Sequence, residues 1–150
     1  MNASNIRKAQ PDDAEALFDI MVRATGTNCS ASYPPEIMEI WHKGRTPDGM
    51  RKIIITDEFY CLTDDRKPLG FVHFTDTEIV GLCIDPEYHG IGVGTRLFEF
   101  AASRIPARPL RVNSSLNAEG FYQKRGCVRV GMGTIRRNDH DIYVVKMELQ

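Results

Sequence analysis

Long apolar runs are missing from this sequence, and no stretch approaches the roughly 18 to 20 apolar residues that cross a bilayer. The N-terminal segment MNASNIRKAQPDDAE also lacks the apolar core of a secretory signal. We therefore expect a cytoplasmic protein with no membrane partner. No CxxC pair and no histidine at ligand spacing accompanies the cysteines, so we expect neither a metal nor a disulfide framework, but four mostly buried free thiols: Cys29, Cys61, Cys83 and Cys127.

An excess of one charge is also missing, because 19 Lys and Arg residues face 20 Asp and Glu residues for a formal net charge of -1. No overall basic field exists to gather nucleic acid, so we expect no nucleic-acid partner, and an anionic ligand would need a local binding device. The chain has no internal repeat, low-complexity segment or linker. Its length and 42% hydrophobic content suit one sizeable core, which predicts one domain over residues 1–150.

The hydrophobic periodicity changes repeatedly between the helical and the strand type. Helices are predicted over 11–26, ended by Gly26; after Pro34-Pro35; over 92–105; and over 116–125, N-capped by Ser115 and ended by Gly126. Strands are predicted over 6–9, 58–63, 69–75, 78–84, 110–112, 128–135 and 142–149. The segment Thr46-Pro47-Asp48-Gly49 is interpreted as a turn that precedes the second strand.

The connections between the strands at 58–84 are too short for parallel crossovers, so these three strands are predicted to form an antiparallel meander. The order of elements predicts an α/β fold with a central mixed, mostly antiparallel sheet of about seven strands. Helices are expected on both faces of this sheet.

The most informative segment is IVGLCIDPEYHGIGVGTR, residues 79–96, in which an apolar strand runs into a glycine-rich turn and then a helix. Gly90, Gly92 and Gly94 lack Cβ atoms, so backbone N–H groups can close on phosphate oxygens, and the helix N-terminus adds about half a positive charge. The letters match neither GxxxxGK[ST] nor GxGxxG, which disfavours the P-loop and Rossmann interpretations. A structural turn that binds nothing is the alternative.

The run DPEYHGIGVGTRLF resembles the acetyl-CoA signature of the GNAT superfamily of N-acetyltransferases, which is Gln or Arg, two residues, Gly, any residue, then Gly or Ala. Here the pattern falls on His89, Gly92 and Gly94, with His89 in place of the usual Gln or Arg. The first and last segments, IRKAQPDDAEAL and IYVVKMEL, resemble the family too. The resemblance therefore covers nearly the whole chain.

A second run, NSSLNAEGFYQKRGC, is similar to the later motif of the family, Ala, three residues, Tyr, three residues, Gly, which falls on Ala118, Tyr122 and Gly126. Cys127 replaces the usual Phe, and Ser115 stands where many members carry Asn. Asn117 lies in the same turn, close enough to contact a cofactor.

The resemblance implies acetyl-CoA as co-substrate, with its pyrophosphate on residues 90–95 and its pantetheine beside residues 82–84. The family opens a V between that strand and the strand ending at Asn113, and a backbone N–H of residues 82–84 would stabilise the oxyanion. The cofactor-binding residues implied are Leu82, Cys83, Ile84, His89, Gly90, Ile91, Gly92, Val93, Gly94, Thr95 and Asn117.

The same resemblance makes Tyr122 the candidate general acid for the leaving thiolate, with helix packing beside Phe121 as the alternative. Glu78 and His73 are the main candidate bases, and spacing does not select either of them. Asp76, His140 and a water chain are further possibilities, and a half-buried structural histidine is the plainer interpretation of His73.

The implied acceptor is an amine of a small molecule or an amino group of a protein, bound by a monomer or a homodimer. A non-catalytic acyl-CoA-binding sensor or interaction module is the rival function, and transfer of a longer acyl chain or acetylation of a hydroxyl is the third. Tyr33, Trp41 and Tyr143 are candidates for an acceptor pocket or for ordinary core packing. The polar run at residues 136–140 is expected to be a solvated hairpin tip or a gate to the acceptor site.

Overall fold

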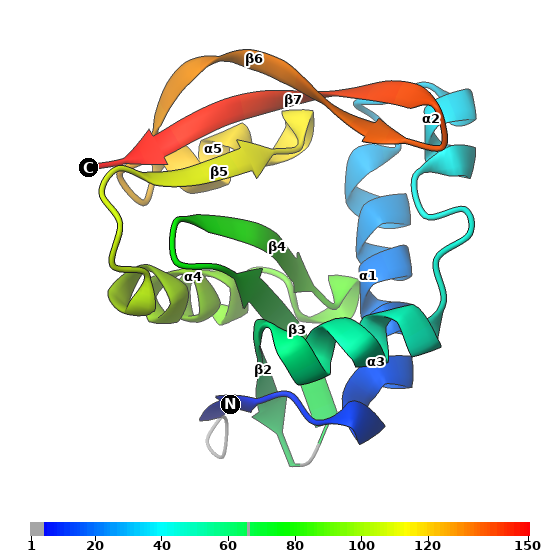
Figure 1. The fold of residues 1–150 in the computed structure, drawn as a ribbon, viewed down its shortest axis with the longest axis vertical. Coiled ribbons are helices and arrows are strands. Elements are labelled where there is room, and N and C mark those ends of the chain that lie inside the picture. Colours follow the sequence, from blue (N-terminus) through cyan, green and yellow to red (C-terminus); the bar gives the residue numbers. More distant parts are fainter. Residues whose placement is uncertain (1–4, 66) are drawn as a thin grey trace.

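The computed structural model describes residues 5–65 and 67–150, and in these residues seven strands form one sheet (Figure 1). The order across the sheet is β1-β2-β3-β4-β5-β7-β6, and β4 with β5 is the parallel pair among antiparallel neighbours. The predicted mixed, mostly antiparallel sheet is therefore confirmed. The strands are β1 Asn5–Lys8, β2 Glu58–Asp64, β3 Lys67–Phe74, β4 Glu78–Ile84, β5 Leu110–Ser114, β6 Val128–Arg137 and β7 His140–Leu149.

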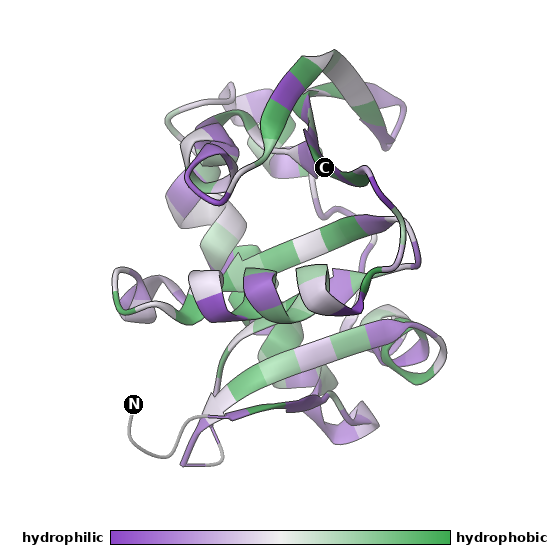
Figure 2. Cartoon of the chain, turned by 90° about the vertical axis from the view of Figure 1, so that its left-hand side faces the viewer, coloured by the Kyte–Doolittle hydropathy of each residue, from purple (hydrophilic) through white to green (hydrophobic). Residues whose placement is uncertain are grey.

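Helices cover both faces of the sheet, as predicted, because alternate strand residues point to opposite sides. Leu62 and Val72 belong to the core beneath α4, whereas their neighbours Cys61 and Phe71 belong to the core beneath α1 and α3. Figure 2 shows hydrophobic positions concentrated on the central strands and hydrophilic ones on the helices around them. The helices are α1 Ala14–Cys29, α2 Pro35–Ile40, α3 Pro47–Thr56, α4 Val93–Arg104 and α5 Glu119–Gln123.

Helix α3 was not predicted, and the supposed turn at residues 46–49 is in fact its N-terminus. Thr46 N-caps the helix by accepting a hydrogen bond from the Gly49 N–H at 3.0 Å, and Pro47 occupies the first helical position. Met50 and Ile54, one turn apart, are buried against α1 and β2. The residues at 46–49 are compatible both with a turn and with a capped helix N-terminus. The burial of Met50 and Ile54 favours the helix.

Two predicted helix boundaries are also wrong. Helix α1 continues through Gly26 to Cys29, because the buried Cys29 packs with Tyr33 and Trp41 and offsets the roughly 1 kcal/mol cost of an internal glycine. The helix predicted over residues 116–125 is shorter: Ser115 makes no side-chain cap, Leu116–Ala118 form a 3₁₀ turn, and α5 spans Glu119–Gln123. The four thiols are free, and three are buried, with Cys83 intermediate.

None of the helices in the described residues is both long enough and apolar enough to span a membrane. The expected cytoplasmic location stays a prediction.

Candidate functional site

The parallel strands β4 and β5 pair only where they begin, at Glu78 with Arg111 and Ile79 with Val112. Directly after this pairing, the register between β3 and β4 shifts, and Val80 is left as the extra residue of a β-bulge. A bulge bends its strand, so β4 turns away from β5 and their facing backbone edges separate. The V that the resemblance implied is therefore present.

A cavity of about 950 Å³ opens along this divergence. Residues 79–84 of β4 line one side, and Val112 and Asn113 of β5 line the other. The volume falls within the range of roughly 300 to 1,000 Å³ that small-molecule sites occupy. The cavity therefore lies between the two strands that were expected to border the substrate-binding site.

The glycine-rich turn lies between β4 and α4 and has the backbone shape of an anion cradle. Gly90 and Gly92 have φ angles of +80° and +92°, and a Cβ added at either would meet no atom within 4 Å. The first helical hydrogen bond of α4 runs from the Arg96 N–H to the Gly92 carbonyl at 3.1 Å. The amides of residues 93–95 precede that bond, so the turn offers open space in front of unpaired donors and suits phosphate.

Gly94 serves a different purpose from the two glycines before it. A Cβ at this position would lie 3.0 Å from the Phe121 ring and 3.3 Å from Ile84 Cδ1. Its missing side chain therefore allows α4, α5 and β4 to approach one another, and its φ angle is ordinary for a helix.

Asp85 fixes the start of this turn to helix α1. Its carboxylate accepts two hydrogen bonds from the Arg23 guanidinium, each 2.9 Å long, and a third from the Glu87 N–H at 3.0 Å. Asp85 is 2% exposed, whereas the Arg23 side chain is 41% exposed. The Arg23 charge holds the pKa of the Asp85 carboxyl below its ordinary value of 3.8.

Replacing Asp85 with Asn is expected to lower the free energy of unfolding by about 2 kcal/mol. Breaking a fully buried ion pair would cost more, but the partly exposed Arg23 guanidinium can be solvated once its partner is lost. For a chain of this size, the melting temperature would fall by about 4–8 °C in thermal unfolding. A carboxyl group whose pKa is lowered by folding stabilises the folded state at pH values above its pKa in the unfolded chain. The difference in unfolding free energy between the parent and Asp85→Asn should therefore persist from pH 8 to 5 and become smaller below about pH 4.

The control for this prediction is Asp19→Asn, which removes the exposed partner of Arg23. It should cost less than about 0.5 kcal/mol. Equal losses for the two variants would contradict the assigned role of Asp85.

Tyr122 lies on α5 and lines the cavity, although only 7% of its surface is exposed. Burial raises the pKa of its phenol well above the ordinary value of 10.0, so the hydroxyl stays protonated at neutral pH. Its ring packs edge-on against Phe98 and Phe121. Within the described residues the hydroxyl makes no hydrogen bond, and it is not among their buried unpaired polar atoms, so it is accessible from the cavity.

The structure separates the two main candidate bases. His73 lines the cavity, stacks on Phe59 and places Nε2 2.8 Å from the Asp57 carboxylate. Glu78 lies at the closed end of the β4–β5 pair, outside the described residues that line the cavity. Asp76 and His140 are exposed and also lie outside this lining.

The other residues implied by the resemblance fall into two groups. His89 and Asn117 line the cavity together with Leu82, Cys83 and Ile84. Residues 90–95 lie beside it at the start of α4, where the Thr95 hydroxyl accepts a hydrogen bond from Arg125.

The three aromatic candidates for an acceptor pocket have different positions. Trp41 lines the cavity and is also buried against Tyr33. The Tyr33 hydroxyl is already used, because it donates to the Tyr143 carbonyl at 2.6 Å and accepts from the Leu116 N–H at 3.0 Å. The Tyr143 side chain is exposed and lies outside the described lining, so Trp41 alone of the three borders the cavity.

The sequence analysis missed His42 and Arg45 and named Arg137 only as part of the polar run at residues 136–140, and all three line the cavity. The tip of the β6–β7 hairpin brings them together: the Asn138 side-chain amide donates to the Ile40 carbonyl at 2.8 Å and to the Lys43 carbonyl at 3.0 Å. Asn138 and Asp139 form the turn with φ angles of 49° and 64°. The contact joins segments almost a hundred residues apart, so no local sequence motif predicts it.

The geometry defines the class of protein: an α/β protein with a cavity between splayed parallel strands, beside a glycine-rich turn that suits a phosphate-bearing ligand. The model of the Acetyltransferase (GNAT) domain family matches residues 29–150. The chain belongs to this family and is an acetyltransferase.

Individual proteins support the same assignment. The chain is 31% identical over 126 residues to the peptidyl-lysine N-acetyltransferase YjaB of Salmonella typhimurium, with 81% of each protein covered. It resembles the crystal structure of a GCN5-related N-acetyltransferase from Rhodopseudomonas palustris with a TM-score of 0.90 and 25% identity, covering 97% of this chain and 94% of the other. It also shares the fold of the Thermoplasma acidophilum PaiA N-acetyltransferase, solved with coenzyme A, with a TM-score of 0.73, 21% identity and 99% coverage of both chains.

Proposed function

We propose that the protein transfers an acetyl group from acetyl-CoA to a primary amine, which attacks directly while both substrates are bound. The observation that carries this proposal is the divergence of β4 from β5 beside an open glycine turn. The name of the Salmonella relative, a peptidyl-lysine N-acetyltransferase, also describes a primary amine as acceptor.

The residues around the turn fit a diphosphate. The open space at Gly90 and Gly92 and the unpaired amides at the start of α4 would hold it. Bound there, acetyl-CoA supplies a thioester whose carbonyl carbon accepts the amine. In the proposed arrangement, a backbone N–H on the β4 edge at residues 82–84 stabilises the negative charge that develops on the carbonyl oxygen.

Tyr122 is proposed to protonate the departing thiolate. Its hydroxyl is protonated at neutral pH, borders the cavity and has no acceptor within the described chain. The hydroxyl is not among the buried unpaired polar atoms of the described residues, so it is accessible from the cavity and available to a bound thioester, which favours the enzyme over a binding module.

His73 is the stronger candidate for removing a proton from the amine, directly or through water. It reaches the cavity wall, and Asp57 orients its ring. Glu78 has no comparable access in the described lining.

The test combines two measurements on the purified protein. Calorimetric titration with acetyl-CoA should give micromolar binding, and a pool of primary amines should release free coenzyme A thiol, detected with a colorimetric thiol reagent. The absence of acetyl-CoA binding by the folded protein would contradict the proposal. Binding without thiol release in the presence of broad amine pools would leave the sensor function instead.

A further inference from the structure

Two arginines converge at the cavity end formed by the α2–α3 loop and the β6–β7 hairpin. Arg45 comes from the loop, Arg137 is the last residue of β6, and both line the cavity with His42. We call these three residues the cationic corner. The Asn138 contacts to the Ile40 and Lys43 carbonyls hold its two segments together.

The cationic corner faces no negative charge. The described residues that line the cavity include no Asp or Glu, and no ion pair among the described residues involves Arg45 or Arg137. Arg137 donates from Nη1 to the Arg136 carbonyl at 3.0 Å, but its buried Nε has no acceptor. A buried guanidinium donor without an acceptor is costly, so an anion at this point would stabilise the site.

The positive charge of the cationic corner lies on its two arginines, and the histidine beside them is neutral. Burial and the charge of Arg137 both lower the pKa of Arg45, although its side chain stays exposed to the open cavity. Burial, followed by the charges of Arg45 and Arg137, lowers the pKa of His42 to about 4, so its imidazole is neutral at pH 7. His42 Nδ1 lies 3.4 Å from Arg45 Nη1, and Nε2 lies 2.9 Å from the Thr25 hydroxyl. A neutral His42 can accept from Arg45 and help to orient it.

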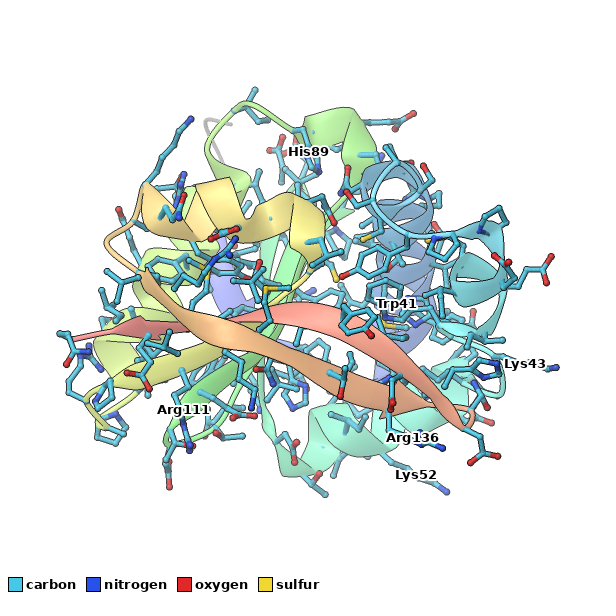
Figure 3. The ribbon with its side chains drawn as sticks, turned by 90° about the horizontal axis from the view of Figure 1, so that it is seen from above. Trp41, Lys43, Lys52, His89, Arg111 and Arg136 are labelled. Atoms are coloured by element: carbon cyan, nitrogen blue, oxygen red, sulfur yellow. The ribbon has the colours of Figure 1, made fainter. Side chains whose placement is uncertain are left out.

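The cationic corner lies away from the glycine turn. In Figure 3, His89, which begins the turn, and Arg136, the neighbour of Arg137, lie on opposite sides of Trp41. A diphosphate at the start of α4 would therefore leave the arginines free for the second substrate.

We propose that the acceptor is a small primary amine that also carries an oxyanion, a carboxylate or a phosphonate-like group, which Arg45 and Arg137 bind. This inference rests on the proposed function and narrows its acceptor. Guanidinium groups recognise such oxyanions through paired, charge-assisted hydrogen bonds. A cavity wall with two arginines and no carboxylate disfavours polycationic amines, which would meet like charge.

The first experiment compares acceptors that differ only in the anion. Glycine, β-alanine, γ-aminobutyrate and the common α-amino acids are each paired with their primary carboxamides, and 2-aminoethylphosphonate is paired with β-alanine to separate the two kinds of oxyanion. Acetyl transfer is followed by thiol release and mass spectrometry. At least one oxyanion-bearing amine should exceed its carboxamide by about 10- to 100-fold in kcat/KM, the size expected for a lost charged hydrogen-bond pair.

The second experiment tests the arginines on the best acceptor of that series. Arg137→Gln and Arg45→Gln should each raise its KM by about 10- to 100-fold, lower the preference over the carboxamide, and leave the Kd of acetyl-CoA within about threefold. The matched control is Arg136→Gln, because Arg136 is exposed, pairs with Asp141 and lies outside the described lining. It should change none of these values.

Several outcomes overturn the proposal. They are a preference for carboxamides, a preference for lysine-containing peptides without an acidic group, or no response to the oxyanion series by a protein that acetylates other amines. Each of these leaves the proposed acetyl transfer intact, whereas failure to bind acetyl-CoA defeats the proposed function itself. A loss of acetyl-CoA affinity in Arg137→Gln would place the arginines on the co-substrate instead.

Discussion

Replacing Tyr122 with Phe is expected to lower kcat by about 10²- to 10³-fold and to leave the Kd of acetyl-CoA within about twofold. The variant removes only the hydroxyl proposed to protonate the leaving thiolate, and the ring packing against Phe98 and Phe121 stays. Because burial raises the pKa of this phenol, its deprotonation should not appear in the rate profile between pH 6 and 9. Steady-state kinetics with acetyl-CoA and the best amine, together with calorimetry, measure both quantities.

Stability separates this catalytic role from a structural one. The Tyr122 hydroxyl has no hydrogen-bond partner in the described chain, so its removal should change the melting temperature by no more than about 2 °C. The control is Tyr60→Phe, because Tyr60 is half-buried against Phe74 and Phe100 and lies outside the described lining. It should retain full activity.

The leaving group gives a second check on Tyr122. An ordinary thiol has a pKa of about 8.5, and a more acidic thiol leaves without needing a proton. The rate deficit of Tyr122→Phe should therefore shrink when the acetyl donor is a thioester of such a thiol. An equal deficit with both donors, or full activity with acetyl-CoA, would remove Tyr122 from the proton transfer.

Much of the fold follows from short-range patterns in the sequence. The meander at residues 58–84 is predictable because its connections are too short for any other pairing, and the structure has that pairing. Helix α3 escaped prediction because its N-terminal letters also suit a turn, and the burial of Met50 and Ile54 is a tertiary property. The same reason explains the continuation of α1 through Gly26, where packing of Cys29 outweighs a local preference.

The residues of the candidate site also fall into those found in local motifs and those brought together by tertiary contacts. The glycine turn and Tyr122 lie in contiguous motifs, so both could be named as candidates from the sequence. The cationic corner depends on a hairpin tip that docks on a distant loop through Asn138, and neither segment carries a motif of its own. The choice between His73 and Glu78 likewise needed the bulge at Val80, which sets where the strands part.

Two substitutions at Gly92, to Asp and to Asn, test whether the glycine turn holds a diphosphate. Asp and Asn have nearly the same shape, and both tolerate the left-handed backbone that the φ angle of +92° requires. A side chain there meets no atom within 4 Å, so both variants should fold, and the backbone strain of a side chain at this φ angle lowers their melting temperatures to a similar extent. A negative charge at the N-terminus of α4 is itself favourable to the helix. The two variants therefore differ mainly in charge.

If the turn holds the diphosphate, Gly92→Asp should weaken acetyl-CoA binding by about 50- to 150-fold relative to Gly92→Asn. That ratio corresponds to about 2–3 kcal/mol, the repulsion expected for unit charges several ångströms apart near a protein surface. The repulsion is screened by salt, so the ratio should fall markedly between 0.05 M and 1 M ionic strength, whereas a steric effect would stay constant. Calorimetric titration of both variants at the two salt concentrations provides the measurement. Equal affinities at low salt would mean that the phosphates bind elsewhere and that the turn serves the fold alone.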